Sequence, residues 1–171
     1  MDFSHLKQLF LPHTNTTPFF SLNTQTHWGR IVSCYDADTM TVVLNTFNGF
    51  YKYNLRLNGI DTCEMKSKVK ENKERAIRAR NRVLQWIGVL PETADLNVAY
   101  TRQQIQTMLE KDVYLVWIQC LEFDKYGRLL AEVHKVPYGE SCSQMLIQEK
   151  YAYIYGGDTK LTEEQQNQLL S

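Results

Sequence analysis

The sequence has no excess charge of either sign, because 19 basic residues balance 19 acidic residues in a chain of 171. A balanced total does not point to a polyanionic partner, so any affinity for nucleic acid must come from a local arrangement of charges. Cysteine is also sparse, and its four occurrences, Cys34, Cys63, Cys120 and Cys142, form no C-x-x-C pair. This spacing argues against a zinc ribbon or a thioredoxin-like redox site and favours reduced, mostly buried thiols.

Signatures of several other protein classes are missing as well. The apolar run at residues 9–11 is short and ends at Pro12, so we expect neither a signal peptide nor a membrane-spanning helix. The four histidines lack the paired spacing of a zinc site or of a histidine-based nuclease motif, and there is no P-loop. We therefore expect an intracellular, cytoplasmic protein without a membrane partner.

What the chain does contain is a series of short β-rich runs, at residues 28–35, 39–44, 51–57, 113–121 and 129–136. The third and fourth runs are separated by residues 67–87, whose apolar side chains are spaced for one face of a helix. Further helical segments are expected near residues 102–109, 141–150 and 162–170. The pattern predicts an α+β fold, a five-stranded Greek-key barrel of OB type with about three helices.

The length suits one globular domain with a single core. We assign residues 28–171 to that domain and residues 1–27 to an N-terminal extension, because residues 13–27 are polar and lack a regular pattern.

Acidic side chains gather where the predicted strands end. Asp36 and Asp38 fall between the first two strands, and Asp61 and Glu64 lie just beyond the third. Hard cations such as Ca²⁺ take several oxygen ligands at ~2.3 to 2.6 Å, so these carboxylates with one main-chain carbonyl could form a cation site. The alternative is an ordinary turn, since aspartate often bonds its own backbone there.

Two arginines occupy unusual places in the pattern. Arg56 lies in an otherwise apolar strand, where a permanently charged side chain needs a partner, and a structural ion pair with a carboxylate would satisfy it. Arg128 closes the segment Asp124-Lys-Tyr-Gly-Arg, which in isolation is a hairpin with Gly127 as the permissive residue and solvated charges.

Two further segments have two readings each. Eight Lys or Arg residues lie between Lys66 and Arg82, against Glu71 and Glu74. Such a run is either a solvated helix face or a strip that guides a polyanion. The tyrosines of residues 151–155 pack on the barrel in one reading; in the other, which only the family resemblance given below implies, one of them stacks on a base, a contact that contributes ~1 to 3 kcal/mol.

Four pieces of the sequence occur in a distinctive order. They are Asp-Ala-Asp-Thr at 36–39, Leu-Arg-Leu-Asn-Gly-Ile-Asp-Thr-Cys-Glu at 55–64, Phe-Asp-Lys-Tyr-Gly-Arg-Leu-Leu-Ala at 123–131 and Ala-Tyr-Ile-Tyr-Gly-Gly at 152–157. Together they resemble the thermonuclease (staphylococcal nuclease) family over about residues 31–160. Each piece alone is weak, and their order makes the resemblance specific.

The resemblance implies a Ca²⁺ site made by Asp38, Asp61 and the main-chain carbonyl of Thr62. Glu64 would lie nearby, either as a general base or as a residue that orients the attacking water. Arg56 and Arg128 would clamp the phosphate, and replacing either by lysine is expected to lower turnover while the fold stays intact. The other residues implied to contact substrate are Lys125, Tyr126, Tyr153 and Tyr155.

The resemblance therefore predicts a calcium-dependent endonuclease that hydrolyses DNA, with RNA as a second candidate substrate, with little sequence preference and with 3′-phosphate products. Cys63 departs from the family, which usually has proline there, and the neutral net charge predicts weaker, more salt-sensitive binding than in its strongly basic members. No protein partner is evident.

Two other functions remain open: a non-catalytic OB module that binds single strands, and an interaction protein that uses the barrel as a scaffold. The combined presence of Asp38, Arg56, Asp61, Glu64 and Arg128 favours the enzyme. A pure binding module has no physical need for carboxylates that repel phosphate.

Overall fold

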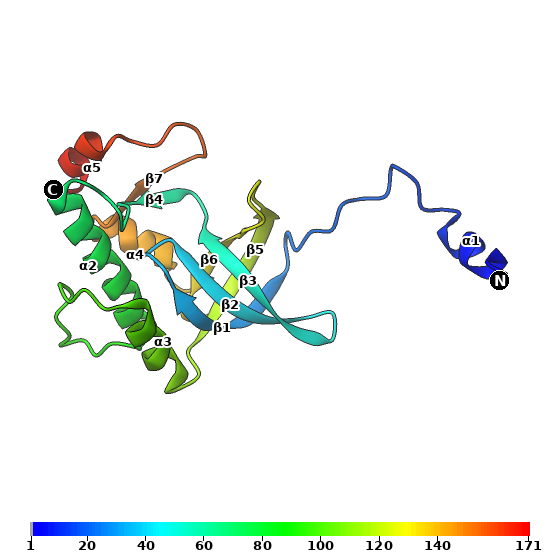
Figure 1. Cartoon of the computed structure of the whole chain (residues 1–171), viewed down its shortest axis with the longest axis horizontal. Coiled ribbons are helices and arrows are strands. Elements are labelled where there is room, and N and C mark those ends of the chain that lie inside the picture. The colour runs from blue at the N-terminus through cyan, green and yellow to red at the C-terminus, as the bar shows by residue number, and fades with distance from the viewer. Residues whose placement is uncertain (1) are drawn as a thin grey trace.

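The computed structural model describes residues 2–171 and centres on a closed barrel of five strands, in the order β1-β2-β3-β6-β5 (Figure 1). The strands are β1 (Thr26–Cys34), β2 (Thr39–Thr46), β3 (Gly49–Leu57), β5 (Leu115–Phe123) and β6 (Leu129–His134). The α+β class and the five-stranded barrel predicted from the sequence are confirmed.

The barrel closes because its strands alternate apolar inward side chains with outward ones. Neighbouring strands are antiparallel except β3 and β6, which run parallel from the Leu55–Leu129 pair to the Leu57–Ala131 pair. The inward side chains are fully buried and form the centre of the core: Ile31, Val42, Leu55, Ile118 and Val133. Burying each such side chain stabilises the fold by about 1.5 to 3 kcal/mol relative to leaving it exposed.

Five helices accompany the barrel within residues 2–171, so the expected number of about three was too low. They are α1 (Ser4–Phe10), α2 (Lys70–Trp86), α3 (Arg102–Glu110), α4 (Cys142–Gln148) and α5 (Glu163–Leu170). Helix α1 has no buried residue and no side-chain cap at its N-terminus. The sequence therefore offers neither an apolar face nor a capping residue from which this helix could be predicted. Helices α3, α4 and α5 each begin at a capping box, in which a Thr or Ser side chain and a Gln side chain bond the first turn.

A second, two-stranded sheet lies beside the barrel. Strand β4 (Ile60–Thr62) pairs antiparallel with β7 (Ala152–Ile154), and Asp61 is the register partner of Tyr153. Just after β7, the Tyr155 N–H donates to the Gly59 carbonyl at 2.8 Å. This pairing holds the segment between β7 and α5 against the strand that carries Asp61.

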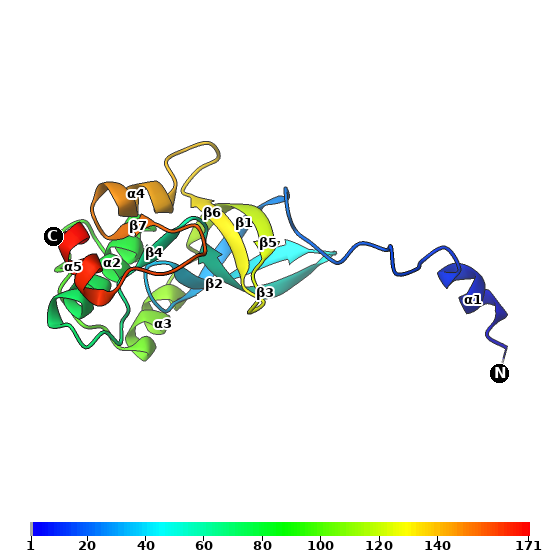
Figure 2. The ribbon, with the colours of Figure 1, turned by 90° about the horizontal axis from the view of Figure 1, so that it is seen from above.

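The N-terminal segment leaves the barrel as an arm that ends in α1, on the side away from α2 and α5 (Figures 1 and 2). The arm joins the barrel before β1 begins, because Leu22 is fully buried and the Thr24 N–H donates to the Cys120 carbonyl at 3.1 Å. The last residues of the predicted extension thus contact the barrel.

All four cysteines are buried and free of disulfides, as the sequence predicted. Burial raises the pKa of Cys34 to about 12 and that of Cys120 to about 11, which keeps both as neutral thiols. None of the helices within residues 2–171 has the length and apolar composition needed to cross a membrane.

Candidate functional site

The guanidinium of Arg56 joins two carboxylates from different segments, Asp38 just before β2 and Asp61 within β4. Its Nη1 lies 2.9 Å from Asp38 Oδ1, and its Nη2 lies 2.7 Å from Asp61 Oδ1. The same Nη2 donates to the Ile60 carbonyl at 3.3 Å. Arg56 is only 8% exposed, and although burial alone would lower its pKa, the charge of Asp38 and the hydrogen bond to Asp61 raise it.

Both carboxylate oxygens of Asp61 already have partners. Oδ1 accepts from Arg56 and lies 2.9 Å from Lys160 Nζ, and Oδ2 accepts from the Tyr153 hydroxyl at 2.6 Å. Burial by itself would raise the pKa of Asp61, but the hydrogen bonds from Tyr153, Lys160 and Arg56 outweigh it and lower that pKa. Asp61 is therefore held as a carboxylate, and both of its oxygens already accept hydrogen bonds.

Lys160 connects this buried pair to Glu64. Its Nζ also donates to Glu64 Oε1 at 3.0 Å, and the Glu64 side chain is 59% exposed. Sequence reasoning did not identify Lys160, because it lies in a loop between β7 and α5 without periodicity or a local motif. The β4–β7 pairing before its loop, and the hydrogen bonds of Glu163 to Ser67 and Asn72 after it, bring it near Asp61.

Asp36 adds a third carboxylate beside Asp38. It is buried, and its Oδ1 has no hydrogen-bond partner among residues 2–171. Burial and the neighbouring Asp38 charge raise the pKa of Asp36 to about 8. Asp38 itself is fixed by the Thr39 hydroxyl, which donates to its Oδ1 at 3.0 Å.

We call Asp36, Asp38, Asp61 and Glu64 the carboxylate cluster. Oxygen donors of this kind suit a hard cation such as Ca²⁺, and the Lys160 ammonium between Asp61 and Glu64 shows that this place attracts positive charge. As they lie, no three or more Asp, Glu, His or Cys side chains of residues 2–171 are arranged to hold a metal ion. The donor chemistry fits a divalent ion, provided that Lys160 moves away.

Thr62, implied as a carbonyl ligand, is buried in β4 next to Asp61 and pairs with Ala152 of β7. Its position beside Asp61 is compatible with a main-chain ligand on the same strand.

Arg128 lies in the turn between β5 and β6. Asp124 organises this turn, because its Oδ1 accepts the backbone N–H groups of Tyr126 and Arg128, each at 2.9 Å. Its Oδ2 accepts from Arg128 Nε at 2.7 Å. Gly127 has a φ of +79°, which a residue with a side chain rarely adopts.

The terminal amino groups of Arg128 make no hydrogen bond to any part of the chain from residue 2 to 171, and its guanidinium lies 5.5 Å from the centre of the exposed Tyr126 ring. This arginine therefore has donors available for a ligand.

Arg56 and Arg128 line the same cavity, which has a volume of about 440 Å³. Asp124, Lys125, Tyr126 and Tyr155 line it as well. We call it the arginine pocket. The hairpin motif and the β3 motif, more than 60 residues apart in the sequence, thus meet at one hollow because β3 and β6 are neighbours in the barrel.

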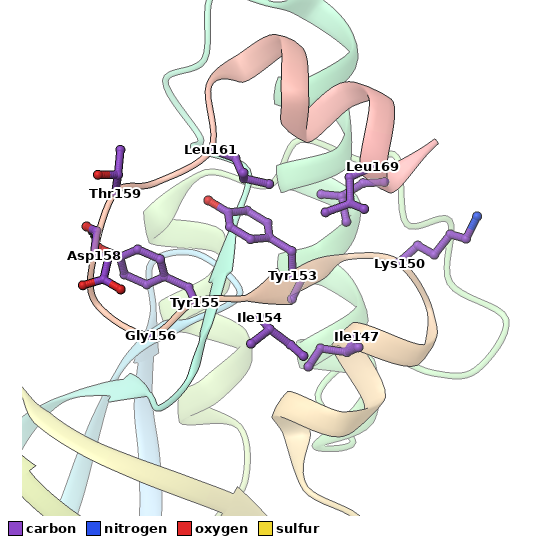
Figure 3. A pocket seen from close by; sticks show the side chains of 12 residues that line it. Ile147, Lys150, Tyr153, Ile154, Tyr155, Gly156, Asp158, Thr159, Leu161 and Leu169 are labelled. Carbon is purple, nitrogen blue, oxygen red and sulfur yellow. Dashed lines mark hydrogen bonds between the residues drawn. The ribbon is translucent and has the colours of Figure 1, made fainter.

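The two candidate tyrosines have different surroundings (Figure 3). Tyr153 points toward Leu161, is 5% exposed and bonds Asp61, so it supports the carboxylate cluster. Tyr155 points toward Asp158, whose carbonyl accepts its hydroxyl at 2.9 Å, and it borders the arginine pocket. Of the two, only Tyr155 is placed to meet a ligand in that pocket.

A larger cavity of about 620 Å³ lies beside β7 and α5 (Figure 3). Its lining is mostly apolar, with Ile147, Ile154, Leu161 and Leu169, and it contains no arginine. The smaller arginine pocket is the better candidate for chemistry, because the charged groups converge there.

The basic residues between Lys66 and Arg82 do not form one strip. Arg75 is buried and donates to Asn72 and Asn167, whereas Arg82 forms two hydrogen bonds of 2.8 Å with Glu149. Arg80 is also buried, but it donates to a third partner, the Tyr100 carbonyl. A helix turns about 100° per residue, so neighbours in such a run point in several directions.

In comparisons with known proteins, no family model matches the chain and no curated protein matches it. The motif resemblance and the geometry above are therefore the grounds for a functional proposal.

Proposed function

We propose that the protein is a calcium-dependent nuclease of the thermonuclease type, which hydrolyses phosphodiester bonds of DNA, with RNA as a second candidate substrate. The observation that carries the proposal is the meeting of Arg56 and Arg128 at one cavity, with the carboxylates Asp38 and Asp61 bound to the Arg56 guanidinium. A scissile phosphate between the arginines would lie next to the carboxylate cluster.

The arginines supply the means to bind and activate a phosphodiester. Arg128 presents terminal N–H donors to the pocket, and Lys125 lines the same hollow. Paired guanidinium donors match phosphate oxygens and stabilise the charge that grows on them in the transition state. Removing one such donor typically costs about 10²- to 10³-fold in turnover.

Glu64 is the residue that would act on the attacking water. Its exposed carboxylate belongs to the cluster and is held by Lys160 alone among the charged side chains of residues 2–171. Whether it removes the proton or orients the water, help of this kind typically contributes about 10²- to 10⁴-fold.

Asp38, Asp61 and the Thr62 carbonyl would hold the Ca²⁺ ion. When bound, the ion would supply Lewis-acid stabilisation of negative charge on a phosphate oxygen. Arg56 fixes the relative positions of the two aspartates before any ion arrives, because one rigid guanidinium bonds both.

We also assign the barrel to the OB type. In support, five strands close in the order β1-β2-β3-β6-β5, and helical segments lie between β3 and β5. OB barrels bind oligonucleotides on the face of their second and third strands, and β3 carries Arg56 here.

A second candidate is a non-catalytic module that binds single strands. It is favoured by one observation, that both oxygens of Asp61 are already paired with Arg56, Lys160 and Tyr153. It leaves the carboxylate cluster without a purpose, which is why we prefer the enzyme.

The test is cleavage of end-labelled DNA by the full chain with Ca²⁺, with Mg²⁺ or Mn²⁺, and with EDTA. We expect internal cleavage in Ca²⁺ that leaves 3′-phosphate ends and stops in EDTA. Asp38→Ala should abolish it, whereas Asp95→Asn, at an exposed acid outside the cluster, should not. DNA that stays intact with every metal would contradict the proposal and favour the binding module.

A further inference from the structure

A groove runs along the outer face of the barrel, away from the arginine pocket. It consists of two cavities of about 270 and 490 Å³ that share Ser33, Thr41 and Arg102. Residues of β1, β2, β3 and α3 line it. We call this surface the outer groove.

The strand register connects the outer groove to the carboxylate cluster. Arg56, Asn54 and Lys52 are alternate residues of β3 and share its outward face, paired with Thr39, Thr41 and Val43 of β2. At about 3.3 Å per residue, this row extends roughly 13 Å from Arg56 to Lys52.

Thr39 marks the inner end of the groove. It lines the smaller of the two cavities and donates to Asp38 at 3.0 Å. Met65, the residue after Glu64, lines the same cavity. The outer groove therefore begins at the carboxylate cluster and leads away from it.

The groove concentrates positive charge in a chain that is neutral overall. Four basic side chains line it, Arg30, Lys52, Arg80 and Arg102, against the single acid Glu110. A hollow lined by one sign of charge attracts a ligand of the opposite sign, and such contacts dominate the affinity of proteins for nucleic acid backbones.

None of these four side chains forms a salt bridge within residues 2–171, and main-chain carbonyls hold two of the arginines instead. Arg80 is 5% exposed and donates to the Tyr100 carbonyl at 3.1 Å, and Arg30 donates to the Asp112 carbonyl at 3.3 Å. The Nε atom of each is buried without a hydrogen-bond partner in the described part of the chain. By contrast, Arg56, Arg82 and Arg128 all form salt bridges within residues 2–171, whereas the basic side chains of the groove form none.

The smaller cavity offers a contact that favours a single strand over a duplex, because the bases of a duplex are already stacked and paired with one another. The exposed ring of Tyr35 lines this cavity and offers a surface on which a base can stack.

We propose that the outer groove binds the backbone of a single-stranded polynucleotide on one side of the scissile bond, while the arginine pocket holds the scissile phosphate. The inference rests on the proposed nuclease function and specifies its substrate as an extended single strand. Lys52 and Arg102 contact the flanking phosphates, and Tyr35 stacks on a base.

Binding of a fluorescent 20-nucleotide oligothymidylate in EDTA tests the groove without any cleavage. We expect Lys52→Glu and Arg102→Glu each to weaken binding about tenfold. Each should also lower the slope of log K against log salt concentration by about one, because one phosphate contact is lost. The matched control is Lys135→Glu, an exposed position that lines neither cavity, and it should bind like the wild type. Equal affinities for the groove variants and the control would overturn the proposal.

Two other polyanions, a DNA duplex and polyglutamate, test whether the outer groove prefers a single-stranded polynucleotide. A duplex of the same length should bind the wild type more weakly than the single strand, and polyglutamate of equal charge should displace the single strand poorly. A duplex or a polyglutamate peptide that binds as tightly as the single strand would overturn the assignment to single-stranded polynucleotide.

Cleavage separates this proposal from the nuclease proposal. The ratio of kcat/KM for a 20-nucleotide strand to that for a dinucleotide should fall about tenfold in the groove variants and stay unchanged in Lys135→Glu. Normal cleavage with unaltered binding in the groove variants would refute the groove alone. Absence of cleavage with every substrate, together with weaker binding by the groove variants, would refute the nuclease and leave the groove as a binding site.

Discussion

Arg56 and Arg128 line one cavity but are held in opposite ways. Arg56 is buried and bonds two carboxylates, one just before β2 and one within β4. Arg128 is partly exposed and bonds one carboxylate, Asp124, four residues earlier in its own hairpin. The contrast teaches that Arg56 also belongs to the architecture of the site, whereas the terminal amino groups of Arg128 are all available to a ligand.

The largest expected effect follows from removing Arg56. Arg56→Ala leaves Asp38 and Asp61 buried without their shared cation, and breaking a buried pair in this way typically costs about 3 to 5 kcal/mol of stability. Arg56→Lys should also lose stability, because one ammonium cannot reproduce two directed bonds to separate carboxylates. The structure thus predicts that Arg56→Lys lowers stability as well as turnover, whereas the sequence predicted a loss of turnover with the fold intact.

Urea denaturation measures this loss, and the control is Arg82→Lys, which alters the more exposed pair with Glu149. The control should change stability by less than about 1 kcal/mol. An Arg56→Ala protein as stable as the wild type would remove the architectural role of Arg56.

Arg128 should show the opposite behaviour. Arg128→Lys breaks only a partly exposed pair within a hairpin, so the free energy of unfolding should change by less than about 1 kcal/mol. Turnover should nevertheless fall about 10²- to 10³-fold, because lysine cannot present the paired donors of a guanidinium. Steady-state kinetics on DNA measure this effect, and turnover near that of the wild type would contradict the clamp.

Lys160 tests whether the carboxylate cluster can bind a cation in place of an ammonium group. Its ammonium lies between Asp61 and Glu64, where a divalent ion would have to replace it. Lys160→Met should therefore raise the affinity for Ca²⁺ about tenfold, which corresponds to about 1.4 kcal/mol. Calorimetry should find no such gain for Lys150→Met, and an unchanged affinity in Lys160→Met would show that the ammonium does not compete with the ion.

Asp36 extends the comparison to pH dependence. Burial raises its pKa to about 8, so the folded chain holds this proton more tightly than the unfolded chain does. Stability contributed by the neutral form is then lost as pH rises from about 4 to about 8, and the loss levels off above that. Asp36→Asn should be at least about 1 kcal/mol more stable than the wild type at pH 8, with a smaller difference at pH 5.

Thermal denaturation between pH 5 and pH 9 records this difference. Two curves that stay parallel over the whole range would indicate that Asp36 is not held as the neutral acid.

The barrel strands could be predicted because inward and outward residues alternate in short runs between turn signals. The convergence of Asp38, Arg56 and Asp61 also followed from the motifs, and the structure brings all three together. Lys160 could not be predicted, since its place depends on the pairing of β4 with β7 across about 90 residues of chain. Long-range pairing of this kind leaves no local trace in the sequence.

The tyrosines and the basic run illustrate the same limit. Tyr153 and Tyr155 are two residues apart, so in one continuous strand their side chains would lie on the same face. They have different surroundings because β7 ends at Ile154, between them. The basic residues of α2 looked like a strip in the sequence, but the helix directs them to separate partners such as Asn72, Tyr100 and Glu149.

The most direct measurement of the central claim is the turnover of a single internally labelled strand by the purified chain as Ca²⁺ is titrated, with Arg128→Lys assayed beside it. The account predicts calcium-dependent cleavage that saturates in the wild type and falls at least about 10²-fold in the variant. Cleavage that is independent of Ca²⁺, or equal in both proteins, would contradict it.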